Sequence, residues 1–306
     1  MAASLFERTG DAAASLRIAL GVATQGRPHL IAQLLDALRR QSRTADAIFL
    51  CAPGVGDIPG IAQAHPDIRV LTGVGGLTRQ RNEILRQLDD FDVVIFLDDD
   101  FVPGRRYIES TAAVFAARPD VVMTTGIVLA DGILGPGLEL ADARVILLNA
   151  EAERQRPTTT LDVYSAYGCN MAIRLAPVRE HRLVFDEHLP LYGWLEDVDF
   201  SRGLACHGRI LKVAAAVGVH LGVKSGRQSG VRLGYSQIAN PVYLVRKGTC
   251  SPQRALFLMS RNIAANLVRL LRPEPYVDRP GRALGNGRAL LDFVTGRLAP
   301  SRALSL

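Results

Sequence analysis

The sequence predicts an α/β protein in which a single doubly wound, mostly parallel sheet is flanked by helices and followed by a helical C-terminal extension. Three observations lead to this fold class. Short apolar runs alternate with segments of helical periodicity over residues 16–126. The run VVIFL at residues 93–97 has no polar alternation, which is typical of a strand buried on both faces of a parallel sheet. From Lys224 onward the chain carries 14 Lys and Arg against 3 Asp and Glu, which sets a basic C-terminal region apart.

The elements are expected to alternate between strand and helix in the first part of the chain. Apolar runs predict strands at residues 16–23, 47–51, 68–71, 93–97 and 121–126, and helical spacing predicts helices from Pro28, over 77–88 and over 105–117. Residues 128–160 are Gly-rich and then charged, so an inserted segment is expected over the sheet edge. Strand character returns at 161–174 and 213–219.

Bulk composition describes a globular protein with a sizeable core. The chain has 306 residues, 48% hydrophobic and 22% charged, which suits one large domain with an appendage. The first residues lack the pattern of a secretory signal, and no stretch approaches the roughly 18–20 apolar residues of a spanning helix. The four cysteines are widely spaced, as expected in a reducing compartment. We therefore expect a cytoplasmic protein with a flexible N-terminus at residues 1–14.

Three consecutive acids, Asp98, Asp99 and Asp100, follow the buried strand. Ligands collect at the carboxyl ends of parallel strands, and adjacent carboxylates repel one another unless a cation or solvent relieves them. The residues alone leave open an acidic surface turn and a divalent-metal site. The glycine-bearing turns at residues 21–26 and 73–76 match neither a phosphate loop nor a dinucleotide fingerprint, which disfavours nucleoside triphosphatases and dehydrogenases.

Five motifs occur in an order that resembles the family 2 glycosyltransferases of the GT-A fold. They are TQGRP at residues 24–28, RQRN at 79–82, DDD at 98–100, GCNM at 168–171 and ED at 196–197. The match covers roughly residues 15–225, and the segment 278–297 is similar to tails of bacterial exopolysaccharide glycosyltransferases. The resemblance implies a cell-surface glycan enzyme that transfers one sugar, with inversion, from a nucleotide-diphosphate sugar to a glycan or lipid-linked acceptor.

The resemblance also assigns roles to single residues and divides the body into a nucleotide-sugar-binding half, 15–128, and an acceptor-binding, catalytic half, 129–230. Asp98, Asp100 and His220 would hold Mn²⁺ or Mg²⁺, and alternation turns Asp99 elsewhere. Asp197 would be the general base, with Glu196 holding the acceptor or orienting the base. The donor would contact Thr24, Arg27, Asp57, Arg79, Arg81, Asp98, Lys224 and Arg227, and the acceptor would contact Trp194, Asn170 and Met171. Asp57 stands in for an aspartate that many members carry after the second strand.

The extension, residues 231–306, leaves alternatives open. Leu256, Met259, Ile263, Leu267 and Leu270 fall on one helical face, with arginines elsewhere. Such a helix suits the surface of an anionic membrane at its cytoplasmic side, or packing on the body or in a homodimer. No nucleic-acid module is recognised, so nucleic acid is not expected as a partner. Competing functions are a nucleotidyltransferase of similar fold and a non-catalytic sugar-nucleotide-binding protein.

Overall fold

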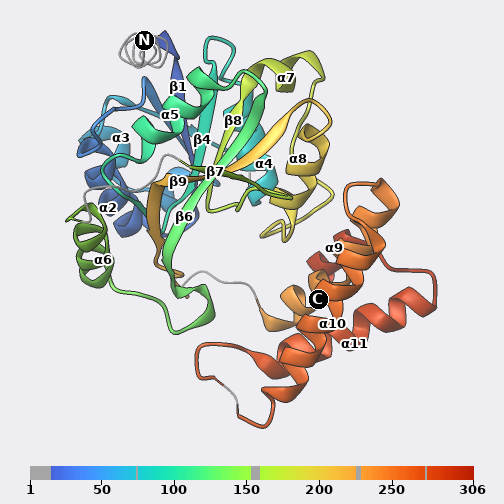
Figure 1. Cartoon of the computed structure of the whole chain (residues 1–306). Coiled ribbons are helices and arrows are strands. Elements are labelled where there is room, and N and C mark those ends of the chain that lie inside the picture. Colours follow the sequence, from blue (N-terminus) through green and yellow to red (C-terminus); the bar gives the residue numbers. More distant parts are fainter. Residues whose placement is uncertain (1–14, 74, 153–158, 225–228, 273) are drawn as a thin grey trace.

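The computed structural model describes residues 15–73, 75–152, 159–224, 229–272 and 274–306 (Figure 1). Within them, a nine-stranded sheet is covered by helices, and the C-terminal helices form a separate group beside it. The predicted fold class is confirmed. The expected flexible N-terminus, residues 1–14, lies outside the described residues.

The sheet has the order β3-β2-β1-β4-β8-β6-β9-β5, with β7 beside β9. The first four neighbours are parallel, β8 is antiparallel to β4 and β6, and β9 is again parallel to β6. The carboxyl ends of β4, β6 and β9 therefore meet at one edge. The strands are β1 (Ile18–Ala23), β2 (Ala47–Ala52), β3 (Ile68–Thr72), β4 (Val93–Asp98), β5 (Phe101–Pro103), β6 (Val121–Asp131), β7 (Thr160–Asp162), β8 (Asn170–Arg174) and β9 (Arg209–His220).

Two apolar layers sandwich the sheet because successive strand residues point to opposite faces. In β1, Ile18 and Leu20 contact one layer while Ala19 contacts the other. The first layer is closed by α2 (Pro28–Arg39), α3 (Ile61–Ala64) and α5 (Tyr107–Ala117). The second is closed by α4 (Leu77–Leu85), α7 (Leu175–Glu180) and α8 (Glu196–Leu204), and α6 (Leu140–Ala152) packs on β9.

The structure departs from the sequence prediction where strands bend. The strand expected at 121–126 continues to Asp131, because β6 follows β9 through several register shifts that bend both strands. Residue 128, the expected boundary between the two halves, consequently lies inside β6. The segment expected as an insertion contains a 3-10 turn, η2 (Gly132–Leu134), and α6, while the strand expected at 161–174 divides into β7 and β8.

The extension consists of α9 (Gly230–Lys247), α10 (Pro252–Val268), α11 (Arg279–Val294) and the 3-10 turn η3 (Pro300–Ser305). Each long helix begins at a side-chain cap, supplied by Ser229, Ser251 and Asp278. Buried amides join the helices, because Asn266 Nδ2 donates to Gln237 Oε1 (2.9 Å) and to Asn286 Oδ1 (2.8 Å). Among the described helices, none is long and apolar enough to cross a bilayer.

Polar contacts attach the extension to the sheet domain. Lys247 Nζ lies 2.7 Å from Asp186 Oδ2 and 2.6 Å from Asp199 Oδ2. Thr249 Oγ1 donates to the same Asp199 carboxylate (2.6 Å), and Tyr243 Oη donates to Asp186 (2.7 Å). Asp199 lies on α8, so the extension contacts the helix that begins with Glu196.

Close approach of α9 and α11 requires glycine at position 285. A Cβ added there would lie 2.1 Å from the Val231 carbonyl oxygen, so Gly285→Ala must push the helices apart. We expect it to destabilise the chain by about 2–4 kcal/mol, as overpacking against backbone does. Gly287→Ala is the matched control, because an added Cβ meets nothing within 4 Å and alanine favours the helix by about 0.5–1 kcal/mol. Urea unfolding followed by circular dichroism measures both, and equal effects would contradict the packing.

Candidate metal centre and active site

The carboxyl-end edge of the sheet brings the predicted metal ligands together. Asp98 ends β4, Asp100 follows in the turn to β5, and His220 ends β9. One ligand atom from each of the three residues lies within 4.8 Å of the other two. His220 Nε2 is 3.3 Å from Asp100 Oδ1, and Asp100 Oδ2 accepts the Val223 amide (2.8 Å). Two carboxylate oxygens and one imidazole nitrogen form a donor set that suits Mn²⁺ or Mg²⁺ and leaves positions for further ligands.

Two residues that the sequence analysis missed hold His220 in place. Asp131 Oδ1 is 2.9 Å from His220 Nδ1, and Tyr167 Oη donates to Asp131 Oδ2 (2.9 Å). The Tyr167 ring also meets the imidazole edge to face. Burial alone would lower the pKa of His220, but hydrogen bonds to Asp100 and Asp131 raise it to about 10. Asp131 engages Nδ1, so Nε2 is the ring nitrogen that faces Asp100. Histidines that bind metals are commonly held by a carboxylate at the other ring nitrogen in this way.

Asp99 turns away from this group, as alternation predicts, but it has partners of its own. Thr24 Oγ1 donates to Asp99 Oδ2 (2.7 Å), and Arg27 Nη1 donates to Oδ1 (3.0 Å). Burial raises the pKa of Asp99 to about 7 even though Arg27 and Thr24 oppose the shift. Two residues predicted to bind the donor thus fix the turn after β1 to the turn after β4.

Arg81 occupies the centre of the site. Its guanidinium is 2% exposed and lies about 5.5 Å from the rings of Phe96 and Phe185. Nη1 pairs with Glu196 Oε1, while Nη2 donates to Asp98 Oδ1 (3.2 Å) and to the Gly168 carbonyl (2.8 Å). The predicted donor-binding arginine therefore connects the end of β4 with the start of α8.

The two predicted catalytic acids lie in the first turn of α8. Asp197 is half-buried; Oδ2 accepts the Gly168 amide (2.9 Å) and Oδ1 accepts the Val198 amide (2.8 Å). Glu196 is 5% exposed, and its Oε2 has no hydrogen-bond partner within the described residues. Burial is the main cause of the raised pKa of Asp197. It also raises the pKa of Glu196, to about 8. Both carboxyls are thus more basic than exposed ones.

The turn before these acids is strained. Leu191 and Leu195 have left-handed φ values of 64° and 73°, which non-glycine residues rarely adopt. Between them, the half-buried Trp194 accepts a hydrogen bond at its carbonyl from Asn240 Nδ2 of α9 (2.8 Å). Such strain persists only where surrounding contacts fix it, and it is frequent at functional sites.

The remaining predicted donor residues that the structure describes have partners other than the two α8 acids. Arg79 is 58% exposed at its side chain and lies 3.5 Å from Glu187. Asp57 Oδ2 accepts the Gly54 amide (3.1 Å) in the turn after β2. Lys224 Nζ donates to the carbonyls of residues 132 and 133 (2.9 Å each). Arg227 lies outside the described residues.

The acceptor contacts predicted for Asn170 and Met171 do not fit their positions. Both residues are 0% exposed, because β8 runs through the middle of the sheet between β4 and β6 and is covered on both faces. Met171 belongs to the apolar core, and Asn170 Oδ1 accepts the Thr125 hydroxyl. The GCNM motif is therefore largely buried, and it contacts the site through the Gly168 backbone amide, which donates to Asp197.

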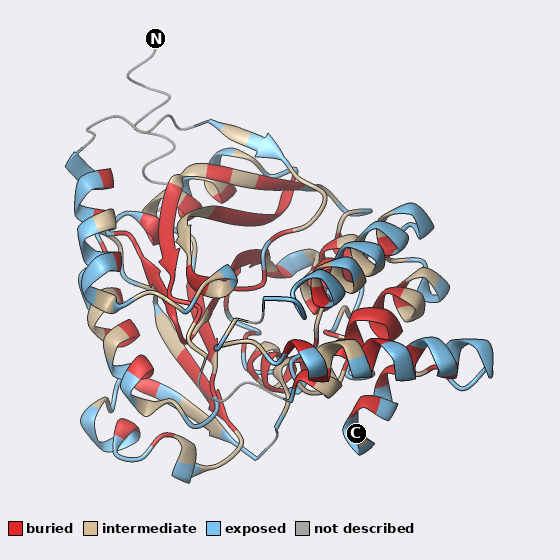
Figure 2. Cartoon of the chain, turned by 90° about the horizontal axis from the view of Figure 1, so that it is seen from below, coloured by how far each residue is buried: buried red, intermediate tan, exposed pale blue. Residues whose placement is uncertain are grey.

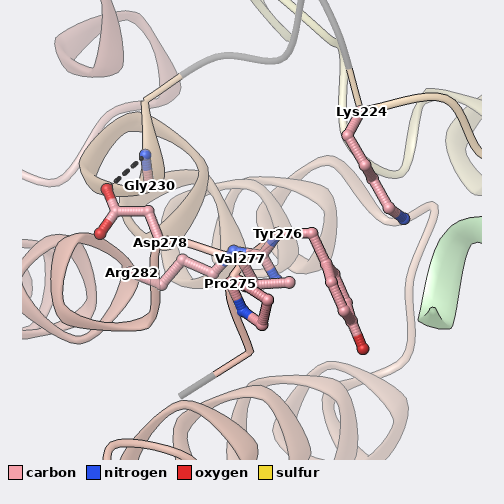
Figure 3. A pocket seen from close by; sticks show the side chains of 7 residues that line it. All are labelled: Lys224, Gly230, Pro275, Tyr276, Val277, Asp278 and Arg282. Atoms are coloured by element: carbon pink, nitrogen blue, oxygen red, sulfur yellow. Dashed lines mark hydrogen bonds between the residues drawn. The ribbon is translucent and has the colours of Figure 1, made fainter. Parts of the chain in front are cut away.

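A cavity of about 350 Å³ opens where the segment after β9 meets the extension (Figure 3). Lys224 supplies one wall, and Tyr276 and Arg282 from the extension supply another. The Lys224 ammonium lies 5.7 Å from the Tyr276 ring centre. Cationic and aromatic side chains from both parts of the chain thus line the same space.

Comparison with solved structures identifies the fold. No family model and no curated protein matches the chain. The solved structure of residues 1–349 of S. aureus TarS in complex with UDP-GlcNAc has a TM-score of 0.57 at 16% identity, covering 94% of this chain and 83% of that one. The mannosyltransferase PcManGT from Pyrobaculum calidifontis, in complex with GDP-Man and Mn²⁺, has a TM-score of 0.52 at 16% identity, covering 94% and 85%. The fold is GT-A.

A third structure with the GT-A fold is GalNAc-T7 with UDP, GalNAc and Mn²⁺. It has a TM-score of 0.57 at 14% identity and covers 92% of this chain, which spans only 59% of that one. At these identities, the likeness lies in the fold, and the chemistry has to be argued from this chain's own residues.

Replacing Arg81 should unfold the site. Arg81→Met would leave the buried Glu196 and the half-buried Asp98 without their cation, and breaking a buried pair typically costs about 3–5 kcal/mol. Arg79→Met, on the same helix, removes only a surface ion pair worth about 0–1 kcal/mol. Denaturant unfolding of both variants measures the difference, and an Arg81→Met protein as stable as Arg79→Met would contradict the bridge.

Removing the support of His220 should weaken metal binding without abolishing it. Asp131→Asn loses the carboxylate that orients His220 Nδ1, so we expect Mn²⁺ affinity to fall about 10–100-fold. Tyr167→Phe removes one hydrogen bond to Asp131 and should have a smaller effect in the same direction. Calorimetric titration with Mn²⁺ measures both, with the exposed Asp162→Asn as control. Wild-type affinity in Asp131→Asn would show that Asp131 does not orient the ligand.

Proposed function

We propose that the chain is a metal-dependent, inverting glycosyltransferase that moves one sugar from a nucleotide-diphosphate sugar to an acceptor hydroxyl. The observation that carries this proposal is the bridge at Arg81, which joins the Asp98, Asp100 and His220 group to the α8 acids. A cation site for a departing diphosphate and a basic carboxylate for an incoming hydroxyl thus share one edge of the sheet. Both lower the barrier to displacement at a sugar carbon.

The metal-binding residues act on the donor side. Asp98, Asp100 and His220 would hold the cation, which when bound neutralises charge that builds on the departing diphosphate. Arg27 adds positive charge nearby, since its Nη1 lies 3.9 Å from Asp100 Oδ2. Thr24 and Asp57, in the turns after β1 and β2, lie on the side proposed for the nucleotide. GDP-Man and UDP-GlcNAc, the ligands of two of the compared structures, support this class of donor without selecting a nucleotide base.

Asp197 would remove the acceptor proton. Each of its oxygens accepts one backbone amide, which orients the carboxylate and leaves a further lone pair for a hydroxyl. Burial raises its pKa, and a more basic carboxylate is a better proton acceptor. Glu196 is paired with Arg81 and nearly inaccessible, so its proposed role is to orient the start of α8.

For the acceptor, we propose a glycan or its lipid-linked precursor in bacterial cell-surface polysaccharide synthesis, used at the cytoplasmic side of the membrane. Trp194 directly precedes the acids and is half-buried, so its exposed surface offers a stacking platform for a sugar ring. The proposed acceptor-binding half, residues 129–230, supplies this tryptophan and both α8 acids. Lys224, predicted to contact the donor, lines a cavity with Tyr276 where this half meets the extension.

Ligand binding tests the donor side. Thermal-shift measurements with nucleoside diphosphates and nucleotide sugars, with and without Mn²⁺, should give one metal-dependent stabilisation that EDTA removes. Asp100→Ala should lose it and Asp197→Asn should keep it. Stabilisation by nucleoside triphosphates with release of pyrophosphate would instead indicate a nucleotidyltransferase.

Asp197→Asn tests the base. The amide keeps the size of the carboxylate but is not basic, so we expect transfer to fall at least about 100-fold while donor binding stays. Transfer is measured as nucleoside diphosphate release in the presence of acceptor, with Asp162→Asn as control. Near-wild-type turnover would exclude Asp197 as base, and metal-dependent donor binding without turnover in the wild type would indicate a non-catalytic binding protein.

A further inference from the structure

Exposed apolar side chains concentrate on the extension. Of the 20 large apolar residues that are exposed within the described part of the chain, 12 lie between Leu256 and Leu304, about one sixth of the sequence. Figure 2 shows long exposed stretches along the helices of this group, around a buried central helix. A globular surface rarely gathers apolar residues in this way without a partner.

On α10 the exposed apolar residues form a stripe of two pairs that lie about three helical turns apart on one side of the helix. Leu256, Phe257, Leu267 and Val268 are 54–67% exposed, and Leu271 just beyond the helix is 86% exposed. The stripe differs from the face predicted from the sequence: Leu256 and Leu267 point outward, whereas Met259 and Ile263 pack inward on the extension core. The inward face is thus already occupied, and the outward one is a second apolar face.

The neighbouring helix α11, which packs against α10, carries a similar stripe. Leu284, Leu291 and Val294 follow one another at spacings of seven and three residues, with Leu290 and Phe293 beside them, and all are exposed. Arg288 lies between Leu284 and Leu291 on this face, as Arg261 lies between Phe257 and Val268 on α10. Each stripe therefore contains an arginine at its middle.

These arginines are not neutralised by the protein. Residues 251–306 contain 9 Arg against 3 acids, a net charge of +6. All three acids are engaged elsewhere: Glu274 with Arg279, Asp292 with Arg302, and Asp278 with backbone amides. Arg261, Arg272 and Arg288 have no acidic partner within the residues that the structure describes.

We propose that the outward faces of α10 and α11 dock on an anionic lipid bilayer. Leucine and phenylalanine side chains enter the acyl boundary, while the unpaired arginines extend to lipid phosphates. A second copy of the chain is a poorer match, because a self-contact would bring like charges together. The contact does not depend on catalysis; if the acceptor is lipid-linked, as proposed above, it also holds the active site beside the acceptor.

Vesicle co-sedimentation of the full chain tests this surface. The protein should bind vesicles of equal parts phosphatidylcholine and phosphatidylglycerol, bind phosphatidylcholine alone more weakly, and lose the difference in high salt. Absence of binding to the anionic vesicles would overturn the proposal.

Variants separate the apolar and charged contributions. Phe257→Ser with Val268→Ser should reduce binding to anionic vesicles about 10-fold or more, since two apolar anchors are lost. Arg261→Gln with Arg288→Gln should remove the preference for anionic lipid. Val145→Ser with Leu148→Ser is the matched control, because these α6 residues are 57% and 64% exposed on the sheet domain. Equal binding by all three variants would contradict docking through this surface.

Two further measurements keep the outcomes distinct. Asp100→Ala should bind vesicles as the wild type does, so a failure of transfer and a failure of docking are seen separately. Light scattering after size exclusion reports the oligomeric state. If Phe257→Ser with Val268→Ser converts a dimer to a monomer, the surface is a contact between copies and the lipid proposal is wrong.

Discussion

The buried guanidinium of Arg81 is the interaction on which the site depends. A buried cation is tolerated only if its donors are paired, and the partners of Arg81 come from three segments far apart in the sequence. Pairing the donors of this one side chain therefore fixes β4, the loop before β8 and the start of α8 relative to one another. The relative positions of these three segments thus follow from a single requirement for charge compensation.

Among the residues that the structure describes, carboxyls outnumber basic side chains at this edge of the sheet. Six carboxyls gather around three basic side chains; the carboxyls belong to Asp98, Asp99, Asp100, Asp131, Glu196 and Asp197, and the bases are Arg27, Arg81 and His220. Burial strengthens both repulsion and attraction, because little solvent screens them. A divalent cation would add positive charge among these carboxyls, and cation binding would then stabilise the site.

Much of the sheet could be predicted from the sequence, because apolar runs are local patterns, whereas the grouping of Asp98, Asp100 and His220 was expected from the family resemblance. Asp131 could not, since it reaches His220 only through the register of β6 and β9, which no local pattern encodes. The structural role of Arg81 was hidden for a similar reason: its position at a helix start suggested a ligand contact. Met171 was misassigned because the motif that contains it does not show that β8 is covered on both faces.

The hydrogen bond from Asn240 to the Trp194 carbonyl has a consequence for how the chain folds. The turn around Trp194 contains two residues in left-handed conformations, so it requires an external contact, and that contact comes from α9. Lys247 adds ion pairs to the same region of the sheet domain. We therefore expect the turn around Trp194 to reach this shape only once α9 is in place, because α9 supplies the contact that fixes it.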